Sequence, residues 1–528
     1  MLLRMGSGQR WISSAVMAGG RAAASSPGGD GNLNPELADV ARLLRRLVRQ
    51  AVSVARADEG SIRSLLTGHL GPQVATFPVA SGTWPRYDQV NVQAGLDAWL
   101  AEPGREHQIA GLTRLHHSMA GLADLAAPGP GHRFMGLGSV TTLSLPSGPD
   151  GATRPCVQCA LYLVTDSGGR LVILVGSEED QVIIEVACPD YDRGQQVVAE
   201  IRRLTVEHNV FRGHVVGFGG DVFGHRNGTL LSFLGRPEVG RDQVILPPEV
   251  LDGVERQVIG VARHAGQLLA SGQHLKRGVL LHGAPGTGKT HMVRYLLSQL
   301  TEATVVVLSG GALRFIAEAC SVARTLQPSV IEVEDVDLIA EERGSRMGQH
   351  PLLFQLLNEM DGLAADADVT FLLTTNRADL LEPALAERPG RVDHATQLPL
   401  PDADARGRLL RLYQGNLDLS GFNTDAVIAR TEGVTASFLK ELLRRAALLA
   451  AASDSGAEGT GGNGTGGRLR VTGEHMNAAL DELLDTRNQL TRILLGAAPQ
   501  RPRQGAAMGA DAVIPARRTP PPDWPLRR

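Results

Sequence analysis

The residue types best suited to chemistry form one glycine-rich run in the second half of the chain. The run reads Gly283-Ala284-Pro285-Gly286-Thr287-Gly288-Lys289-Thr290 and follows the apolar segment Val279-Leu280-Leu281. Glycines at these spacings let successive backbone N–H groups turn inward, and such a turn at the start of a helix binds phosphate groups. We expect Lys289 to add a positive charge for the outer phosphates and Thr290 to offer a hydroxyl to Mg²⁺.

Paired acids form the second candidate feature. The segment 329–337 reads S-V-I-E-V-E-D-V-D, an apolar β-type run that ends in Glu334 and Asp335. A phosphate-binding fold needs one carboxylate near Mg²⁺ and another that orients the attacking water. Because ligands of open parallel sheets bind at the carboxyl ends of the strands, we expect the pair to lie beside the glycine-rich run. A third segment, 371–377, is an apolar strand that ends in the amide of Asn376.

The elements that must position these residues alternate between strand and helix. Strands are expected at 277–283, 303–308, 330–336, 369–375 and 395–400, with helical stretches between most of them. Alternation of this kind favours an α/β fold, a parallel sheet flanked by helices on both faces. The chain from 403 to 496 is predicted to form a helical lid, interrupted by the glycine-rich loop 453–468.

The first half of the chain has a different pattern. Three β-rich runs, 156–164, 170–177 and 181–188, are separated by turn residues and predict an antiparallel meander. A helix is expected at 193–208, with Val197, Ile201 and Leu204 inward, and further strands near 211–219 and 228–234. These elements predict a separate α+β domain, and the segment contains no catalytic constellation.

Cys156-x-x-Cys159 lies in the first of these runs and could suggest zinc or redox chemistry. Residues three apart on a strand point to opposite faces, and the sequence has no second ligand pair. We therefore expect no metal site there.

The predicted organisation has six parts. They are a flexible tail (1–33), an N-terminal α+β domain for client or partner recruitment (34–235), a linker with the start of the core (236–276), a nucleotide-binding subdomain (277–402), the helical lid (403–496) and a disordered tail (497–528). The first tail has arginine and serine but no acid before Asp30, which is also the composition of an organelle transit peptide, and this alternative stays open.

Composition excludes several classes of protein. The net charge of the 528 residues is −4, so we expect no nucleic-acid partner. Only three of the 52 basic residues are lysines, which we attribute to the coding bias of a GC-rich genome. Four cysteines do not make a disulfide scaffold, which favours a reducing, cytoplasmic setting. No stretch approaches the ~18 apolar residues of a membrane span.

Taken together, these residues resemble the AAA family of ATPases over about 245–490. The matching segments are Gly283–Thr290 (Walker A), Val330–Asp337 (Walker B), Thr374–Arg377 (sensor 1), Pro383–Asp393 (the second region of homology), Thr431–Thr435 (the sensor 2 neighbourhood), and Arg470–Thr472 with Ala478–Leu480 (the closing lid helix).

The resemblance implies a homo-oligomeric ring, usually a hexamer, with ATP bound between subunits. Arg388 and Arg391 would lie in the arginine-finger positions and reach the neighbour's γ-phosphate. Asn376 would orient the water, Glu334 would bind Mg²⁺ with Thr290, and Asp335 would be the general base.

The chain departs from the family pattern in the order of the paired acids, at Glu332, and by one residue more between Leu385 and Arg388 than many relatives have. The order Glu334-Asp335 reverses the usual Asp-Glu pair, an order that some branches of the family, including the mitochondrial Bcs1-like branch, also carry. Glu332 takes a position where a buried apolar residue is expected, and we predict a basic or hydrogen-bonding partner for it. Phe315 either faces a central pore or packs in a helix core, and both alternatives stay open.

The function expected from the resemblance is hydrolysis of ATP coupled to remodelling of an unidentified protein client. The alternative is a weakly hydrolysing scaffold or switch whose assembly state depends on the nucleotide. A kinase or a nucleic-acid motor is disfavoured, because the charge is near neutral and the sequence has no phospho-acceptor site or basic groove.

Overall fold

The computed structural model describes residues 62–114, 120–127, 135–178, 180–219, 231–337, 351–364, 366–378, 392–456 and 468–485. The predictions for the two terminal tails, for Arg388 and Arg391 and for most of the glycine-rich lid loop lie outside these residues.

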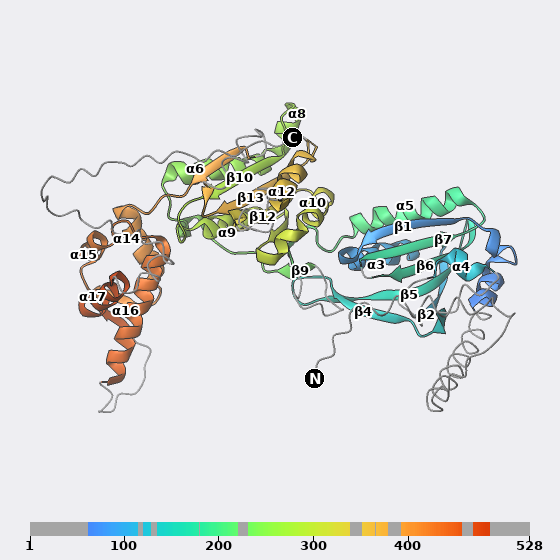
Figure 1. Ribbon diagram of the computed structural model, residues 1–528, viewed down its shortest axis with the longest axis horizontal. Coiled ribbons are helices and arrows are strands. Elements are labelled where there is room, and N and C mark those ends of the chain that lie inside the picture. Colours follow the sequence, from blue (N-terminus) through green and yellow to red (C-terminus); the bar gives the residue numbers. More distant parts are fainter. Residues whose placement is uncertain are drawn as a thin grey trace, which may run out of the picture.

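An antiparallel sheet forms the N-terminal part of the molecule (Figure 1). Its strands are β1 (Val79–Pro85), β2 (Glu106–Arg114), β3 (Met135–Gly138), β4 (Thr141–Pro146), β5 (Thr153–Asp166), β6 (Gly169–Ser177) and β7 (Gln181–Ala187). The strand order is β1-β7-β6-β5-β2-β3, and β4 also pairs with β5. The predicted meander is confirmed, because β5, β6 and β7 pair antiparallel in succession.

Helices cover both faces of this sheet. Helices α3 (Gln89–Leu100) and α5 (Tyr191–Glu207) pack on one face, where Val197, Ile201 and Leu204 are buried as their spacing predicts. The helical residues 62–70 and α4 (Leu122–Ala126) pack on the other. Two covered faces explain why the central strand β5 is apolar over most of its length instead of alternating.

The two cysteines of β5 confirm the opposite-face prediction. Cys156 and Cys159 are buried and belong to different core clusters. Within the described ranges, His, Cys, Asp and Glu side chains form no group of three that could bind a metal ion.

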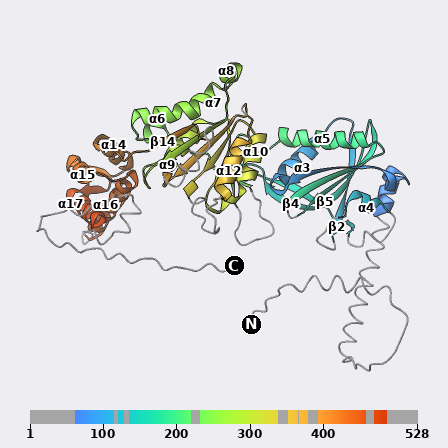
Figure 2. The ribbon, with the colours of Figure 1, turned by 45° about the horizontal axis from the view of Figure 1, so that its top comes forward.

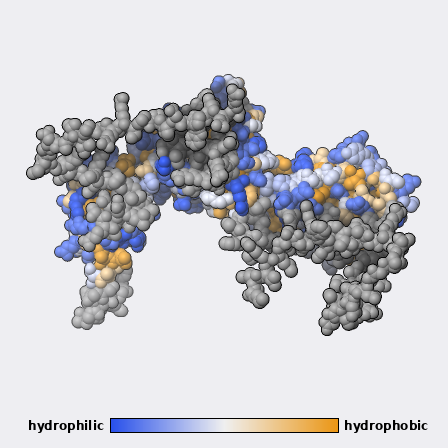
Figure 3. All heavy atoms as spheres, in the orientation of Figure 1, coloured by the Kyte–Doolittle hydropathy of each residue, from blue (hydrophilic) through white to orange (hydrophobic). Residues whose placement is uncertain are grey.

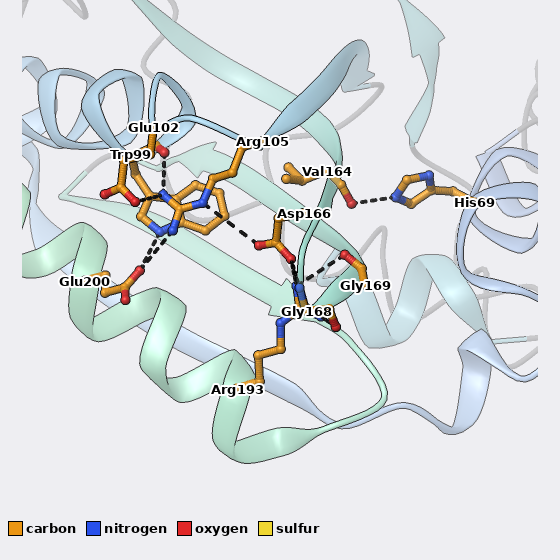
Figure 4. Close-up of polar contacts among 10 residues, drawn as sticks. All are labelled: His69, Trp99, Glu102, Arg105, Val164, Asp166, Gly168, Gly169, Arg193 and Glu200. Atoms are coloured by element: carbon orange, nitrogen blue, oxygen red, sulfur yellow. Dashed lines mark hydrogen bonds and ion pairs between the residues drawn. The ribbon is translucent and has the colours of Figure 1, made fainter.

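A polar network joins the β5–β6 turn to the two helices of the first face (Figure 4). The guanidinium of Arg105 lies 3.9 Å from the ring centroid of Trp99 and 3.4 Å from a carboxylate oxygen of Glu200 on α5. Arg193, also on α5, pairs with Asp166 and donates hydrogen bonds to carbonyl oxygens of the turn. These charges are satisfied by one another, so the network stabilises the domain.

A second sheet of seven strands carries the glycine-rich run and the paired acids. Its order is β14-β10-β13-β12-β11-β8-β9. The strands are β8 (Val215–Phe218), β9 (Leu231–Leu234), β10 (Arg277–His282), β11 (Thr304–Leu308), β12 (Ser329–Val333), β13 (Val369–Thr375) and β14 (His394–Gln397). All neighbours pair parallel except β8 and β9. The predicted α/β fold is confirmed.

Helices sandwich this second sheet. They are α6 (Pro248–Glu255), a π-helical turn (Arg256–Gly260), α7 (Val261–Arg263), α8 (Ala265–Ala270), α9 (Lys289–Gln299), α10 (Ile316–Thr325) and α12 (Pro351–Asp361). Helices α6 and α9 pack with Val279 and Leu372 on one face, and α10 and α12 pack with Leu280 and Phe371 on the other.

Two strands assigned by sequence to the N-terminal domain belong to the second sheet instead. β8 pairs parallel with β11 through Val305↔Val215 and Val306↔Val216, and β9 then forms the edge. The sequence pattern locates a strand correctly but does not say which edge it joins, so the prediction that these strands lie in the first domain is wrong.

An aromatic series crosses the junction between the two sheets. The ring of Tyr87, from the first domain, meets Phe218 of β8 edge-on at 5.9 Å, and Phe218 stacks on Phe315 at 5.3 Å. Phe315 ends a 3-10 turn (Gly310–Phe315) and packs against the core cluster. Of the two alternatives for Phe315, the structure favours core packing.

The lid is a third body, seen in both ribbon views (Figures 1 and 2). It contains α14 (Ala403–Tyr413), α15 (Thr424–Arg430), α16 (Ala436–Gly456) and α17 (Gly473–Leu484), with a parallel pair β15 (Asp418–Gly421) and β16 (Arg470–Thr472). Its own cluster, centred on Phe438 and Leu442, is fully buried. Figure 3 shows apolar side chains on the visible surface of α16, where Leu448 is 62% exposed.

In the described part of the chain, no helix has both the length and the apolar character required to cross a membrane.

Candidate active site

The glycine-rich run forms a tight loop between β10 and α9, as predicted. Gly283, Gly286 and Gly288 have positive φ angles of +153°, +82° and +101°, which strongly favour glycine. A Cβ on Gly283 would lie 2.6 Å from the carbonyl oxygen of Leu398. Helix α9 begins at Lys289, so its unpaired N–H groups face the concave side of the loop.

The lid contacts this loop directly. The backbone N–H of Ser437 donates to the carbonyl oxygen of Gly286 at 3.2 Å. A Cβ on Gly286 would lie 2.9 Å from side-chain atoms of Ser437 and Thr435. The predicted sensor 2 neighbourhood therefore lies against the glycine-rich loop.

Lys289 is buried and faces neutral oxygens. Its Nζ donates to the carbonyl oxygens of Gly283 (2.9 Å) and Ala284 (3.1 Å) and to Oδ1 of Asn376 (2.8 Å). Burial lowers the pKa of Lys289, and the nearby carboxylates of Asp335 and Asp337 oppose this shift. The ammonium is thus held by weak, exchangeable partners at the point where a phosphate group would carry full negative charge.

The paired acids lie where β12 ends. The N–H of Glu334 still donates to Leu308 of β11 at 3.1 Å, and the chain then turns at Asp335, where φ is +50°. The carboxylate of Asp335 accepts a hydrogen bond from Nδ2 of Asn376 at 3.0 Å. Asn376 therefore bridges Lys289 and Asp335, and the predicted convergence of these three residues is observed.

Asp337 is a site residue to which sequence reasoning assigned no role. Its Oδ1 accepts hydrogen bonds from the hydroxyl of Thr375 (2.9 Å) and from the backbone N–H of Asn376 (3.2 Å). These bonds fix the end of β13, from which the Asn376 side chain projects. The sequence does contain a sign of this role: Asp337 is a third acid two residues after the pair, and a later strand ends in the polar residues Thr-Thr-Asn.

Among the described residues, Glu332 has a basic neighbour in Arg294 on α9 but no hydrogen bond or ion pair, so the predicted basic or hydrogen-bonding partner is present only as a nearby charge. Burial and, less strongly, the nearby Glu334 together raise the pKa of Glu332 to about 7 against the opposing effect of Arg294 on α9. The side chain lies in the sheet next to Leu372, where an apolar residue would pack. A buried carboxyl without a hydrogen-bonding partner is protonated at a much higher pH than an exposed one.

The donor set fits a divalent metal. Thr290 is exposed in the first turn of α9, and Glu334 is partly exposed at the carboxyl end of β12. Hydroxyl and carboxylate oxygens are the ligands that hard cations such as Mg²⁺ take in proteins.

The segment that carries Arg388 and Arg391 is described only from Val392 onward. Asp393 accepts a hydrogen bond from the N–H of Gly278 at 3.0 Å, and Leu398 donates to His282 at 2.8 Å. The far end of this segment is therefore attached to β10, the strand that leads into the glycine-rich loop.

Comparison with known proteins agrees with this geometry. Residues 279–400 match the family model described as "ATPase family associated with various cellular activities (AAA)". The chain is 34% identical over 209 residues to an ATP-dependent zinc metalloprotease FtsH of Nitrosococcus oceani, covering 37% of this chain and 32% of that protein.

Two further relatives carry proteasome names. A 26S proteasome regulatory subunit 8 homolog of Schizosaccharomyces pombe is 30% identical, over 38% of this chain and 55% of its own length. A proteasome-activating nucleotidase of Pyrococcus horikoshii is 33% identical, over 33% of this chain and 47% of its own length. The similarity thus spans about one third to one half of each relative.

Proposed function

Because the chain carries an ATPase domain of the AAA family over residues 279–400, we propose that it binds ATP with Mg²⁺, hydrolyses it, and uses the cycle to remodel a protein client. The observation that carries the proposal is the bridge Lys289–Asn376–Asp335 at the mouth of the glycine-rich loop. A γ-phosphate and an attacking water are positioned by a cation, an amide and a carboxylate that lie side by side.

Each residue has a role in this mechanism. The loop N–H groups and Lys289 bind the β- and γ-phosphates, and Asn376 moves from Lys289 to the attacking water. Asp335 accepts the proton of that water as its oxygen bonds to the γ-phosphorus and the bond to the β-phosphate oxygen breaks, which releases ADP and phosphate. Thr290 and Glu334 would hold Mg²⁺, which neutralises phosphate charge when bound.

Hydrolysis is tested with two variants that fail differently. Lys289→Ala should abolish both nucleotide binding and phosphate release, whereas Asp335→Asn should still bind ATP and lose turnover by ~10²-fold or more. Lys440→Ala, which removes an exposed lid lysine, is the control and should behave as wild type. Wild-type protein that binds ATP but releases no phosphate with Mg²⁺ would overturn the proposal and favour the scaffold or switch.

The active site is proposed to be shared between subunits of a homo-oligomeric, hexameric ring, with Arg388 or Arg391 reaching the neighbour's γ-phosphate. Complementation tests this arrangement. Arg391→Ala subunits have an intact site but no finger, and Lys289→Ala subunits have a finger but no site. Mixing two inactive preparations should restore part of the turnover if Arg391 acts in trans, and the same test applies to Arg388→Ala.

The first sheet domain is proposed to recruit the client. The support is its separate, fully formed core and its direct packing on the ATPase core through Tyr87 and Phe218. Full-length Asp335→Asn should retain a client in ATP and release it in ADP. The four cysteines of the chain are few for its length and all buried, which supports a reducing compartment such as the cytoplasm.

A further inference from the structure

Asp335 has an unusual backbone conformation. Among the described residues it is the one non-glycine with a positive φ, +50°. The left-handed region is strained for most side chains but is visited more readily by aspartate and asparagine. The reversed Glu334-Asp335 order therefore places the more tolerant acid at the strained position.

A hydroxyl of the neighbouring strand holds this backbone. The N–H of Glu334 donates to a carbonyl oxygen of β11, but the next N–H, of Asp335, donates to Oγ1 of Thr374 at 3.1 Å. Thr374 is 1% exposed and lies near the end of β13. The Thr374 hydroxyl can accept this hydrogen bond because the chain has left the direction of β12 at Asp335, where its N–H no longer points to β11.

One residue of β13 and the residue that directly follows this strand thus fix both parts of Asp335. Thr374 accepts a hydrogen bond from its backbone N–H, and Asn376, the first residue after the strand, donates to its carboxylate. The carboxylate of an aspartate is one methylene shorter than that of a glutamate, so its direction is set mainly by the backbone.

We propose that Thr374 is a positioning residue for hydrolysis, which holds Asp335 in the left-handed conformation that directs its carboxylate to Asn376 and the attacking water. The proposal rests on the proposed role of Asp335 as general base. Thr374 should therefore affect the chemical step and not nucleotide binding, because its hydroxyl is hydrogen-bonded to Asp335 and, within the described residues, makes no hydrogen bond to the glycine-rich loop.

The kinetic test removes the hydroxyl without changing the volume of the side chain. Thr374→Val should lower kcat by ~10-fold or more and leave the KM for ATP within ~3-fold, while Thr374→Ser should retain kcat within ~3-fold. Thr370→Val is the matched control, because Thr370 lies on the same strand, is equally buried, and has a hydroxyl that finds no hydrogen-bond partner among the described residues. It should leave kcat unchanged.

A structural test separates failure of this proposal from failure of the proposed function. In a crystal structure of Thr374→Val, φ of Asp335 should leave the left-handed region and the contact with Asn376 should lengthen, whether or not the protein hydrolyses ATP. Unchanged φ and an intact 3.0 Å contact would overturn the role of Thr374. Active wild type with equal kcat for Thr374→Val and Thr370→Val would also overturn it.

Discussion

The ammonium of Lys289 lies 2.8 Å from the side-chain oxygen of Asn376, so the cation of the glycine-rich loop is already bound to the amide that also contacts Asp335. A neutral amide is a weaker partner for an ammonium than a phosphate group is. Binding of a nucleotide at Lys289 would therefore release Asn376 and couple occupancy of the loop to the position of the amide near Asp335.

Removal of the amide should separate binding from hydrolysis. Asn376→Ala deletes the group that orients the water, so we expect kcat to fall by ~10²-fold. The affinity for ATP should stay within ~3-fold or improve, because Lys289 loses a competing partner. Titration with a fluorescent ATP analogue and a phosphate-release assay measure the two effects, and binding weakened tenfold would contradict this account.

The glycine that meets the lid should not accept a side chain. Gly286→Ala adds a Cβ at φ +82°, within 2.9 Å of the Ser437 and Thr435 side chains. We expect ATP binding to weaken at least tenfold and stability to fall by more than the ~1–2 kcal/mol of left-handed strain alone. Gly272→Ala is the control, since Gly272 has a φ of +73° and no atom of the described residues lies within 4 Å of the added Cβ. Equal losses in the two variants would argue against the lid contact.

Asp337 should stabilise the end of β13 through its two accepted hydrogen bonds. Asp337→Ala removes the acceptor of the Thr375 hydroxyl proton and of the Asn376 N–H, which we expect to lower the free energy of unfolding by about 2 kcal/mol and to lower kcat. Asp337→Asn keeps an acceptor oxygen and should lose less of both. Denaturant unfolding and turnover are measured on the same preparations. Both the free energy of unfolding and kcat should be lowest for Asp337→Ala, intermediate for Asp337→Asn and highest for the wild type.

Glu332 should make stability depend on pH. Its folded-state pKa is about 7, against an ordinary value of 4.5. Because the folded state binds the proton more tightly, the free energy of unfolding should decrease as pH rises from about 4.5 through 7, by up to about 3 kcal/mol. Glu332→Gln should remove this contribution, so its melting temperature should match wild type near pH 4.5 and exceed it at pH 8.

The matching control for that experiment is Glu249→Gln, which changes an exposed carboxylate on α6. The melting temperature of this control should change between pH 4.5 and pH 8 by as much as that of the wild type. A Glu332→Gln variant that is less stable than wild type at pH 8 would indicate that the carboxylate has a partner in the folded protein.

The sequence by itself determined the local features of this protein. Glycine spacing, the lysine at the start of a helix and runs of β-branched residues depend on near neighbours, so the loop 283–290 and the strands β10 to β13 fall where they were predicted. The order of residues also showed that the Glu334-Asp335 pair follows an apolar strand.

The tertiary structure alone decided which strands meet. Because β13 lies between β10 and β12, Asn376 reaches both Lys289 and Asp335, and Thr374 reaches the backbone of Asp335. The same long-range pairing placed β8 beside β11. Strand order arises from packing of the whole sheet and its two layers of helices, and no local spacing of residue types encodes it.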